Sequence, residues 1–244
     1  MGIPEPGASR MPGAGEIHLW RITLDAPDAL PSSARNLLSP DETARADRFL
    51  RDEHRRRFTV TRGALRILLG RYLSMSPAAV AFAYGDKGKP RFADTDACLE
   101  FNVSHSNELA LVAFANGRAL GVDVEWTRTR AAGESIARRF FSPAETTALM
   151  ALPEADREWA FYACWTRKEA YIKARGEGVS LGLDTFGVTL APGTPPKLLF
   201  AKEGEAEVRR WTFEDIDPGP GYAGALAYEG TPASIQCFDF DPQA

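Results

Sequence analysis

Hydrophobic and polar residues alternate along two stretches of the chain, and this alternation predicts β-strands. Residues 16–24 alternate in this way and are rich in residues that favour strands. In residues 119–125 apolar side chains occupy every second position from Leu120, with glycine or a carboxylate between them. Successive side chains of a strand point to opposite faces, so Asp123 and Glu125 share the polar face.

The sequence Ser-Pro-x-Glu occurs at residues 39–42 and again at 142–145. Serine as N-cap, proline at the first helical position and glutamate two residues further on form a capping box, which predicts a helix start. Each start precedes a longer helical pattern, about 52–73 in the first half and an aromatic-rich run through 165–178 in the second. This rough repeat predicts an α+β protein made of two similar subdomains.

Asn116-Gly117 is the strongest hairpin signal in the sequence and predicts the boundary between the subdomains. We therefore expect an N-terminal subdomain over 15–117 and a C-terminal subdomain over 118–244. Residues 1–14 are rich in glycine and proline and are expected to form a disordered tail. Further strand-like runs predict a sheet that completes the second half: 186–190, 197–200, 206–213, 224–228 and 234–238.

Composition narrows the class of protein. The net charge of −4 argues against a nucleic-acid-binding protein, although a local basic patch is compatible with it. No apolar run reaches 18 residues, so we expect no membrane span. The three cysteines are far apart and form no Cys-x-x-Cys pair. This pattern suggests neither a disulfide framework nor a zinc site, and it favours a reducing cytoplasm.

Charged side chains suggest a candidate site without proving one. Glu169 and Lys173 lie one turn apart on the predicted helix, as a surface ion pair or as half of a site for a metal and a phosphate. Asp123 and Glu125 repel each other, and a hard cation between them would relieve the repulsion, although a solvent-facing strand would look the same. The loop 85–92 is a turn or a phosphate-binding edge. The arginines at 51, 55, 56, 57 and 62 form a solvated face or contact an anion.

The order and spacing of five motifs are more specific than any one of them. The motifs are Gly-Lys-Pro (88–90), Phe-Asn-Val-Ser-His-Ser (101–106), Gly-Val-Asp-Val-Glu (121–125), Phe-Phe-Ser-Pro-Ala-Glu (140–145) and Trp-x-x-Lys-Glu-Ala-x-x-Lys (165–173). Together they resemble the 4′-phosphopantetheinyl transferases of the monomeric type that activates surfactin synthetase. The resemblance extends from about residue 17 to about residue 188.

The resemblance implies a reaction and an architecture. The enzyme would take coenzyme A with Mg²⁺, transfer phosphopantetheine to a serine of an apo acyl or peptidyl carrier protein, and release 3′,5′-ADP. Two pseudo-symmetric α+β halves would enclose the active site in the cleft between them, in a monomer.

The resemblance also implies roles for individual residues. Asp123, Glu125 and Glu169 would be the metal ligands, and Lys173 would contact the phosphates. Glu169, or a water beside it, would take the proton of the serine. Asp123, Glu169 and Lys173 are thus the expected catalytic residues.

For coenzyme A, the resemblance implies a phosphate contact from His105 with help from Ser104. Lys89 and Pro90 would line the adenine side, and Lys87 is a further candidate. Relatives often carry a lysine for the 3′-phosphate where this chain has Glu42, so Arg45 or Arg57 is expected to take that task. The tryptophans at 126, 159 and 165 are expected to belong to the core.

The expected partner surface contains Arg128, Arg130, Arg138 and Arg139, a basic patch that would steer an acidic carrier protein or else form a solvated loop.

Two other functions would use some of the residues of the candidate site. One is a Mg²⁺-dependent hydrolase of nucleotide pyrophosphates, and the other is a non-catalytic protein that binds coenzyme A or carriers. The complete set of three carboxylates and Lys173 argues against the second.

Overall fold

A computed structural model describes residues 10–25, 30, 32–85, 87–93, 98–127 and 133–242. The helices of this part are α1 (Pro40–Asp47), α2 (Asp52–Leu73), α3 (Gly133–Phe140), α4 (Pro143–Ala151), α5 (Glu154–Arg175) and α6 (Glu205–Arg210). The strands are β1 (Glu16–Thr23), β2 (Phe82–Tyr84), β3 (Pro90–Phe92), β4 (Leu99–Ser106), β5 (Leu109–Asn116), β6 (Leu120–Trp126), β7 (Phe186–Val188), β8 (Leu198–Ala201), β9 (Trp211–Ile216), β10 (Tyr222–Glu229) and β11 (Ser234–Asp239). Helices and mostly antiparallel strands confirm the predicted α+β class.

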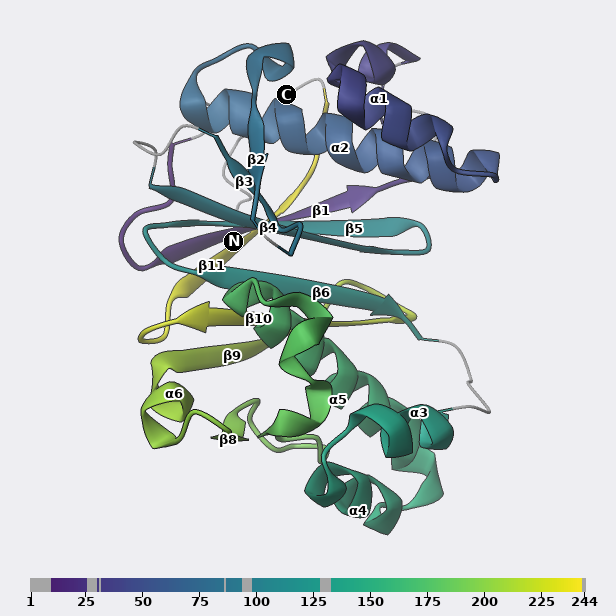
Figure 1. Cartoon of the computed structure of the whole chain (residues 1–244), viewed down its shortest axis with the longest axis vertical. Helices are drawn as coiled ribbons and strands as arrows, with labels where there is room; N and C mark the ends of the chain where they lie inside the picture. Colours follow the sequence, from purple (N-terminus) through teal and green to yellow (C-terminus); the bar gives the residue numbers. More distant parts are fainter. Residues whose placement is uncertain are drawn as a thin grey trace.

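The elements form four layers, with two sheets stacked between helices (Figure 1). The first sheet has the order β11-β1-β5-β4, and α2 covers its outer face. The second sheet has the order β6-β10-β9, and α5 covers its outer face. Apolar side chains of both sheets fill the space between them, including Leu19, Leu111, Val122 and Leu226. Each half therefore buries one long helix against one sheet, as the repeat in the sequence predicts.

The two predicted capping boxes begin helices at the predicted positions, α1 and α4. Both capping glutamates are buried, and each one pairs with a cation of the long helix in its own half. Glu42 Oε2 accepts a hydrogen bond from Arg66 Nε at 2.7 Å, and Glu145 Oε2 lies 2.8 Å from Lys168 Nζ. Both cations also donate to backbone carbonyls of the segment that follows their helix. The same buried ion pair in both halves supports the repeat that the sequence predicts.

Asn116-Gly117 is not a hairpin turn, and that prediction was wrong. The strands on either side of it, β5 and β6, lie in different sheets. Gly117 has a φ of 60°, and its N–H donates to Cys98 O, so this turn carries the chain from one sheet to the other. The real hairpin joins β4 to β5, with Ser106 opposite Leu109 and Asn107 at a φ of 50°.

The C-terminal segment differs from the prediction in two places. Residues 205–210 are helix α6 and not part of a strand. The last strand, β11, does not complete the second half; it runs parallel to β1 in the first sheet, with Phe238 stacked on Trp20. The division of the chain at residue 117 stays a prediction. Strand β11 belongs to the predicted C-terminal subdomain by sequence but lies in the sheet of the N-terminal half. Most of the predicted tail, residues 1–9, lies outside the described residues.

The two sheets meet along β4 and β6, which share no backbone hydrogen-bond ladder. Polar side chains at alternate positions of β4 instead accept hydrogen bonds from backbone N–H groups of β6. The pairs are Val122 N to Asn102 Oδ1 (2.9 Å), Val124 N to Ser104 Oγ (3.3 Å) and Trp126 N to Ser106 Oγ (3.0 Å). We call this row of contacts the seam; it fixes the register of one half against the other.

Candidate active site

Helix α5 lies unusually close to strand β6 at Gly121. A Cβ atom at this position would be 2.1 Å from Ala170 O and 2.3 Å from Ala174 N. Only a glycine permits this approach, which brings the side chain of Lys173 to the polar face of β6. The space beside Gly121 is therefore filled by the backbone of α5 and is not left open beside the carboxylates.

Asp123 is the centre of a buried network of polar contacts. Its Oδ1 lies 2.6 Å from Lys173 Nζ and accepts a hydrogen bond from Ser104 Oγ at 2.9 Å. Lys173 Nζ also donates to Ser104 Oγ at 2.8 Å. The side chains come from β6, α5 and β4, so both halves of the molecule contribute to the site. Lys173 thus pairs with Asp123 rather than forming the surface pair with Glu169 that the helical spacing permits.

The other two carboxylates lie on the same side of β6. Loss of hydration raises the pKa of Glu169, and the negative charges of Asp123 and Glu125 raise it further, against the opposing effect of Lys173. Glu125 Oε2 accepts a hydrogen bond from Ser106 Oγ at 3.0 Å, and its Oε1 accepts one from Trp165 Nε1 at 3.2 Å. The three carboxylates therefore repel one another across a small, partly dehydrated region.

Two observations bear on whether a cation fits these residues. Asp123 Oδ2 is buried and accepts no hydrogen bond from any described residue. A buried oxygen in this state is available to bind a cation. Oxygen ligands of this kind suit Mg²⁺. Over the described ranges, however, no three His, Cys, Asp or Glu side chains already form a group that could hold a metal ion. The donor set fits a hard cation, and the carboxylates would have to draw together to bind it.

His105 faces the opposite way from Ser104, because adjacent residues of a strand point to opposite faces. It borders a cavity of about 200 Å³, whose lining includes Arg45, Arg62, Tyr84 and Pro90. Partial loss of hydration lowers the pKa of His105, and so do the positive charges of Lys173, Arg57, His54 and Arg45. The imidazole thus lies in a basic surrounding that suits an anion.

The loop between β2 and β3 joins this cavity to the end of α5. Pro90 lines the cavity, but Lys89 turns away from it and donates to Leu120 O at 3.1 Å and Ala174 O at 3.3 Å. Lys87 is exposed, and a Cβ on Gly178 would lie 3.5 Å from its own Cβ. Lys89 therefore ties the loop of the first half to the second half.

The arginines of α2 do not form one solvated face. Arg62 is buried and lies 2.7 Å from Glu42 Oε1, while Arg57 makes an ion pair of 2.7 Å with Asp25. Glu42 is itself 1% exposed, so it cannot face a ligand in the cavity. Arg45 is exposed at the cavity with its guanidinium over the ring of Phe58, and it is the better placed of the two candidates for the 3′-phosphate.

Two residues that contact Glu125 were not predicted as site residues. Trp165 was expected to be core; it packs against the core but also donates to Glu125. Ser106 was part of a motif, and its spacing from Ser104 would have placed both on one face. The expectation that Trp126 and Trp159 are core was wrong, since they are 39% and 47% exposed.

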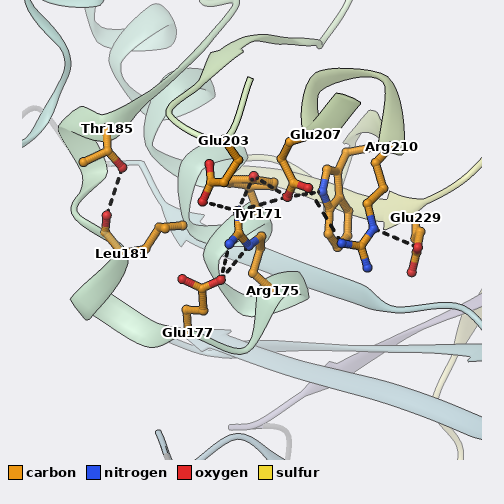
Figure 2. Close-up of polar contacts among 10 residues, drawn as sticks. Tyr171, Arg175, Glu177, Leu181, Thr185, Glu203, Glu207, Arg210 and Glu229 are labelled. Atoms are coloured by element: carbon orange, nitrogen blue, oxygen red, sulfur yellow. Dashed lines mark hydrogen bonds and ion pairs between the residues drawn. The ribbon is translucent and has the colours of Figure 1, made fainter. Parts of the chain in front are cut away.

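A polar network fixes the end of α5 (Figure 2). Arg175 Nη1 donates to Tyr171 Oη at 3.0 Å, Glu203 Oε1 at 2.9 Å and Glu207 Oε1 at 3.0 Å. Arg175 also pairs with Glu177, beyond the glycine that ends the helix. The end of α5 that follows Lys173 is therefore anchored to Glu207 in α6 and to Glu203, which precedes α6.

The predicted basic patch is described only in part. Arg128 and Arg130 lie outside the described residues. Arg138 and Arg139 are exposed in the last turn of α3, and the guanidinium of Arg139 lies 5.1 Å from the centre of the Phe140 ring.

Comparison with known proteins points to one family. The family model described as the 4′-phosphopantetheinyl transferase superfamily matches residues 119–227, and the one described as 4′-phosphopantetheinyl transferase, N-terminal, matches residues 28–116. The chain is 42% identical over 219 residues to the 4′-phosphopantetheinyl transferase HetI of Nostoc sp., with 88% of each chain covered. It is 28% identical over 227 residues to the 4′-phosphopantetheinyl transferase Sfp of Bacillus subtilis, covering 92% of this chain and 99% of that one.

The fold and the site define a two-half α+β protein with three carboxylates and a lysine on one side of β6, where its halves meet. The chain belongs to the 4′-phosphopantetheinyl transferase family, and the resemblance drawn from its motifs is confirmed. None of the helices in the described part of the chain is long and apolar enough to cross a membrane.

Proposed function

We propose that this chain transfers the 4′-phosphopantetheine arm of coenzyme A to a serine of an apo carrier protein in a Mg²⁺-dependent reaction. The serine oxygen forms a bond to the phosphorus that carries pantetheine, the bond from that phosphorus to 3′,5′-ADP breaks, and the serine loses its proton. The observation that carries the proposal is the buried contact of Lys173 with Asp123 and Ser104 at the seam. In this contact the ammonium group of Lys173 lies against Oδ1 of Asp123, while Oδ2 of the same carboxylate accepts no hydrogen bond from a described residue. The contact lies where the two halves meet.

Asp123, Glu125 and Glu169 would hold the Mg²⁺, and the unsatisfied Oδ2 of Asp123 supports this assignment. When bound, the ion would neutralise the pyrophosphate of coenzyme A and orient it. Lys173 supplies a second positive charge for the phosphates. Glu169, or a water beside it, would receive the serine proton, because its carboxylate lies at the place where the phosphates and the incoming serine would meet.

Coenzyme A would occupy the cavity beside His105, with His105 on a phosphate and Pro90 on the adenine side. The cluster of positive charge around His105 supports an anionic ligand there. Arg45 is the proposed contact of the 3′-phosphate. Lys87 stays a weaker candidate, and Lys89 would act by holding the loop rather than by touching the ligand.

The partner would be an acidic acyl or peptidyl carrier protein that docks near the exposed end of α3. Arg138 and Arg139 support this part of the proposal. A monomeric state, a cytoplasmic location and the lack of nucleic-acid or membrane binding stay predictions from the sequence.

Product analysis separates this function from its alternatives. The protein is incubated with coenzyme A and Mg²⁺, with and without an apo carrier domain, and nucleotides are resolved by chromatography. We expect 3′,5′-ADP only when the carrier is present. Free phosphopantetheine formed without a carrier would indicate a pyrophosphate hydrolase. Bound but unchanged coenzyme A with every carrier tested would indicate a binding protein.

A further inference from the structure

Glu125 is held by donors from both halves of the molecule. Ser106 on β4 donates to its Oε2 at 3.0 Å, and Trp165 on α5 donates to its Oε1 at 3.2 Å. Because the donors stand on elements of different halves, the position of this carboxylate depends on how the halves are docked.

Ser106 has a double role at the seam. A serine hydroxyl carries one donor and two acceptor sites. The Ser106 oxygen accepts the Trp126 N–H at 3.0 Å while its proton goes to Glu125. Ser104 does the same two residues earlier, accepting from Val124 N and donating to Asp123 Oδ1. Each serine thus joins a backbone N–H of β6 to the carboxylate of the residue that precedes it.

Trp165 is itself fixed by packing. Its ring stacks on Phe161 at a centroid distance of 6.1 Å and meets Phe140 edge-on at 6.0 Å. The indole N–H therefore points at Glu125 from a rigid support.

These contacts oppose a definite force. Asp123 and Glu125 lie on one face of β6, and their like charges favour rotation of the more exposed Glu125 toward solvent. Two fixed donors keep it on the face of Asp123 before any cation arrives. Groups that orient a ligand in this way commonly change metal affinity by 10- to 100-fold when removed.

We propose that Ser106 and Trp165 are positioning residues that hold Glu125 for the divalent cation and set the affinity of the site. The inference rests on the proposed function, since it takes Glu125 as a metal ligand.

The test measures metal binding directly. Mn²⁺ is titrated into the protein in the presence of coenzyme A, and free Mn²⁺ is followed by electron paramagnetic resonance. We expect Ser106→Ala and Trp165→Phe to raise the Kd for Mn²⁺ by about 10-fold each. Ser106→Thr keeps the hydroxyl and should restore affinity to within about twofold. Trp165→Phe retains an aromatic ring for packing, so it remains informative if Ser106→Ala fails to fold.

Asn102 provides a matched control. It makes the same kind of seam contact, to Val122 N at 2.9 Å, but touches no carboxylate of the site. Asn102→Ala should lower the melting temperature but raise the Kd for Mn²⁺ by less than about twofold, so a larger rise in Ser106→Ala reports the lost donor to Glu125 rather than a weaker seam.

The outcomes separate the two proposals. Wild-type affinity in both Ser106→Ala and Trp165→Phe would overturn the positioning role while leaving the metal site in place. Mn²⁺ binding by the wild type that is unaffected by Asp123→Asn would overturn the metal assignment itself, and the positioning role with it.

Discussion

Lys173 Nζ lies 2.6 Å from Asp123 Oδ1, although the residues are 50 positions apart on α5 and β6. Gly121 makes this contact possible by letting the helix backbone approach the strand. The carboxylate is 5% exposed and the lysine 26% exposed, so the pair is largely shielded from water. Shielding strengthens the attraction, and it also means that removal of either charge leaves the other poorly compensated.

Lys173→Met should impair transfer while keeping most of the aliphatic packing of the side chain. Loss of one charge-assisted hydrogen bond costs about 1.5–3 kcal/mol, which corresponds to a decrease in kcat/KM of roughly 10- to 100-fold. The measurement is the initial rate of carrier modification. Lys202→Met changes an exposed lysine in the turn after β8 and should keep the wild-type rate; equal rates for all three proteins would contradict the role of Lys173.

Glu169→Gln should strongly reduce transfer and yet stabilise the metal-free protein at neutral pH. The pKa of Glu169 is raised above the ordinary value of 4.5, so its ionised form is disfavoured in the folded state. The stability it contributes is complete below pH 4.5 and is lost as the pH rises through the folded pKa. Activity should fall by about 100-fold or more, because a catalytic metal contributes several kcal/mol.

The check on Glu169→Gln combines the carrier assay with thermal melts at pH 7 in EDTA. Glu158→Gln, at an exposed position of the same helix, is the control and should keep the wild-type activity. A lower melting temperature for Glu169→Gln than for the wild type would show that repulsion among the carboxylates is not the dominant effect.

His105 should take up a proton when coenzyme A binds. Its pKa is lowered in the free protein, and an anionic phosphate beside the imidazole would raise it again. Coenzyme A affinity should therefore increase as the pH falls toward 6, and calorimetry in buffers of different ionisation enthalpy should detect net proton uptake near pH 7.

In His105→Ala this uptake should disappear, and KM for coenzyme A should rise about 10- to 100-fold, the equivalent of one charge-assisted hydrogen bond. An unchanged KM together with unchanged proton uptake would remove His105 from the binding site.

Gly121→Ala should loosen the site by pushing α5 away from β6. The new methyl group would overlap backbone atoms, which cannot rotate aside, so the cost should reach about 3 kcal/mol. For a chain of this size that lowers the melting temperature by about 6–12 °C. Gly15→Ala is the control, because a Cβ there meets no atom within 4 Å. A Gly121→Ala protein as stable as the control would contradict the close approach.

Short sequence patterns predicted the features of this fold that depend on neighbouring residues, namely where helices begin and which face of a strand a side chain occupies. Capping boxes marked the starts of α1 and α4, and the alternation over 119–125 placed Asp123 and Glu125 on the face opposite Val122. The spacing of motifs predicted the family. The same rule of alternation, applied to residues 101–106, would have separated His105 from Ser104 and placed Ser106 at the carboxylates.

Long-range pairing was not accessible in the same way. Nothing local in residues 234–239 shows that they pair with β1 rather than with an edge of the second sheet, because the hydrophobic pattern of an edge strand suits either sheet. Likewise, a turn signal such as Asn116-Gly117 shows that the chain bends but not whether the next strand pairs with the last one. The contact of Trp165 with Glu125 depends on the docking of α5, which no short pattern encodes.

The mass of an apo carrier domain, measured after incubation with this protein, coenzyme A and Mg²⁺, tests the central claim most directly. We predict that the carrier gains the mass of one phosphopantetheine group, that EDTA prevents the gain, and that Asp123→Asn reduces it strongly. An unmodified carrier under all conditions would contradict the proposed transfer. An equal gain with Asp123→Asn would show that the site around Lys173 and Asp123 does not carry it out.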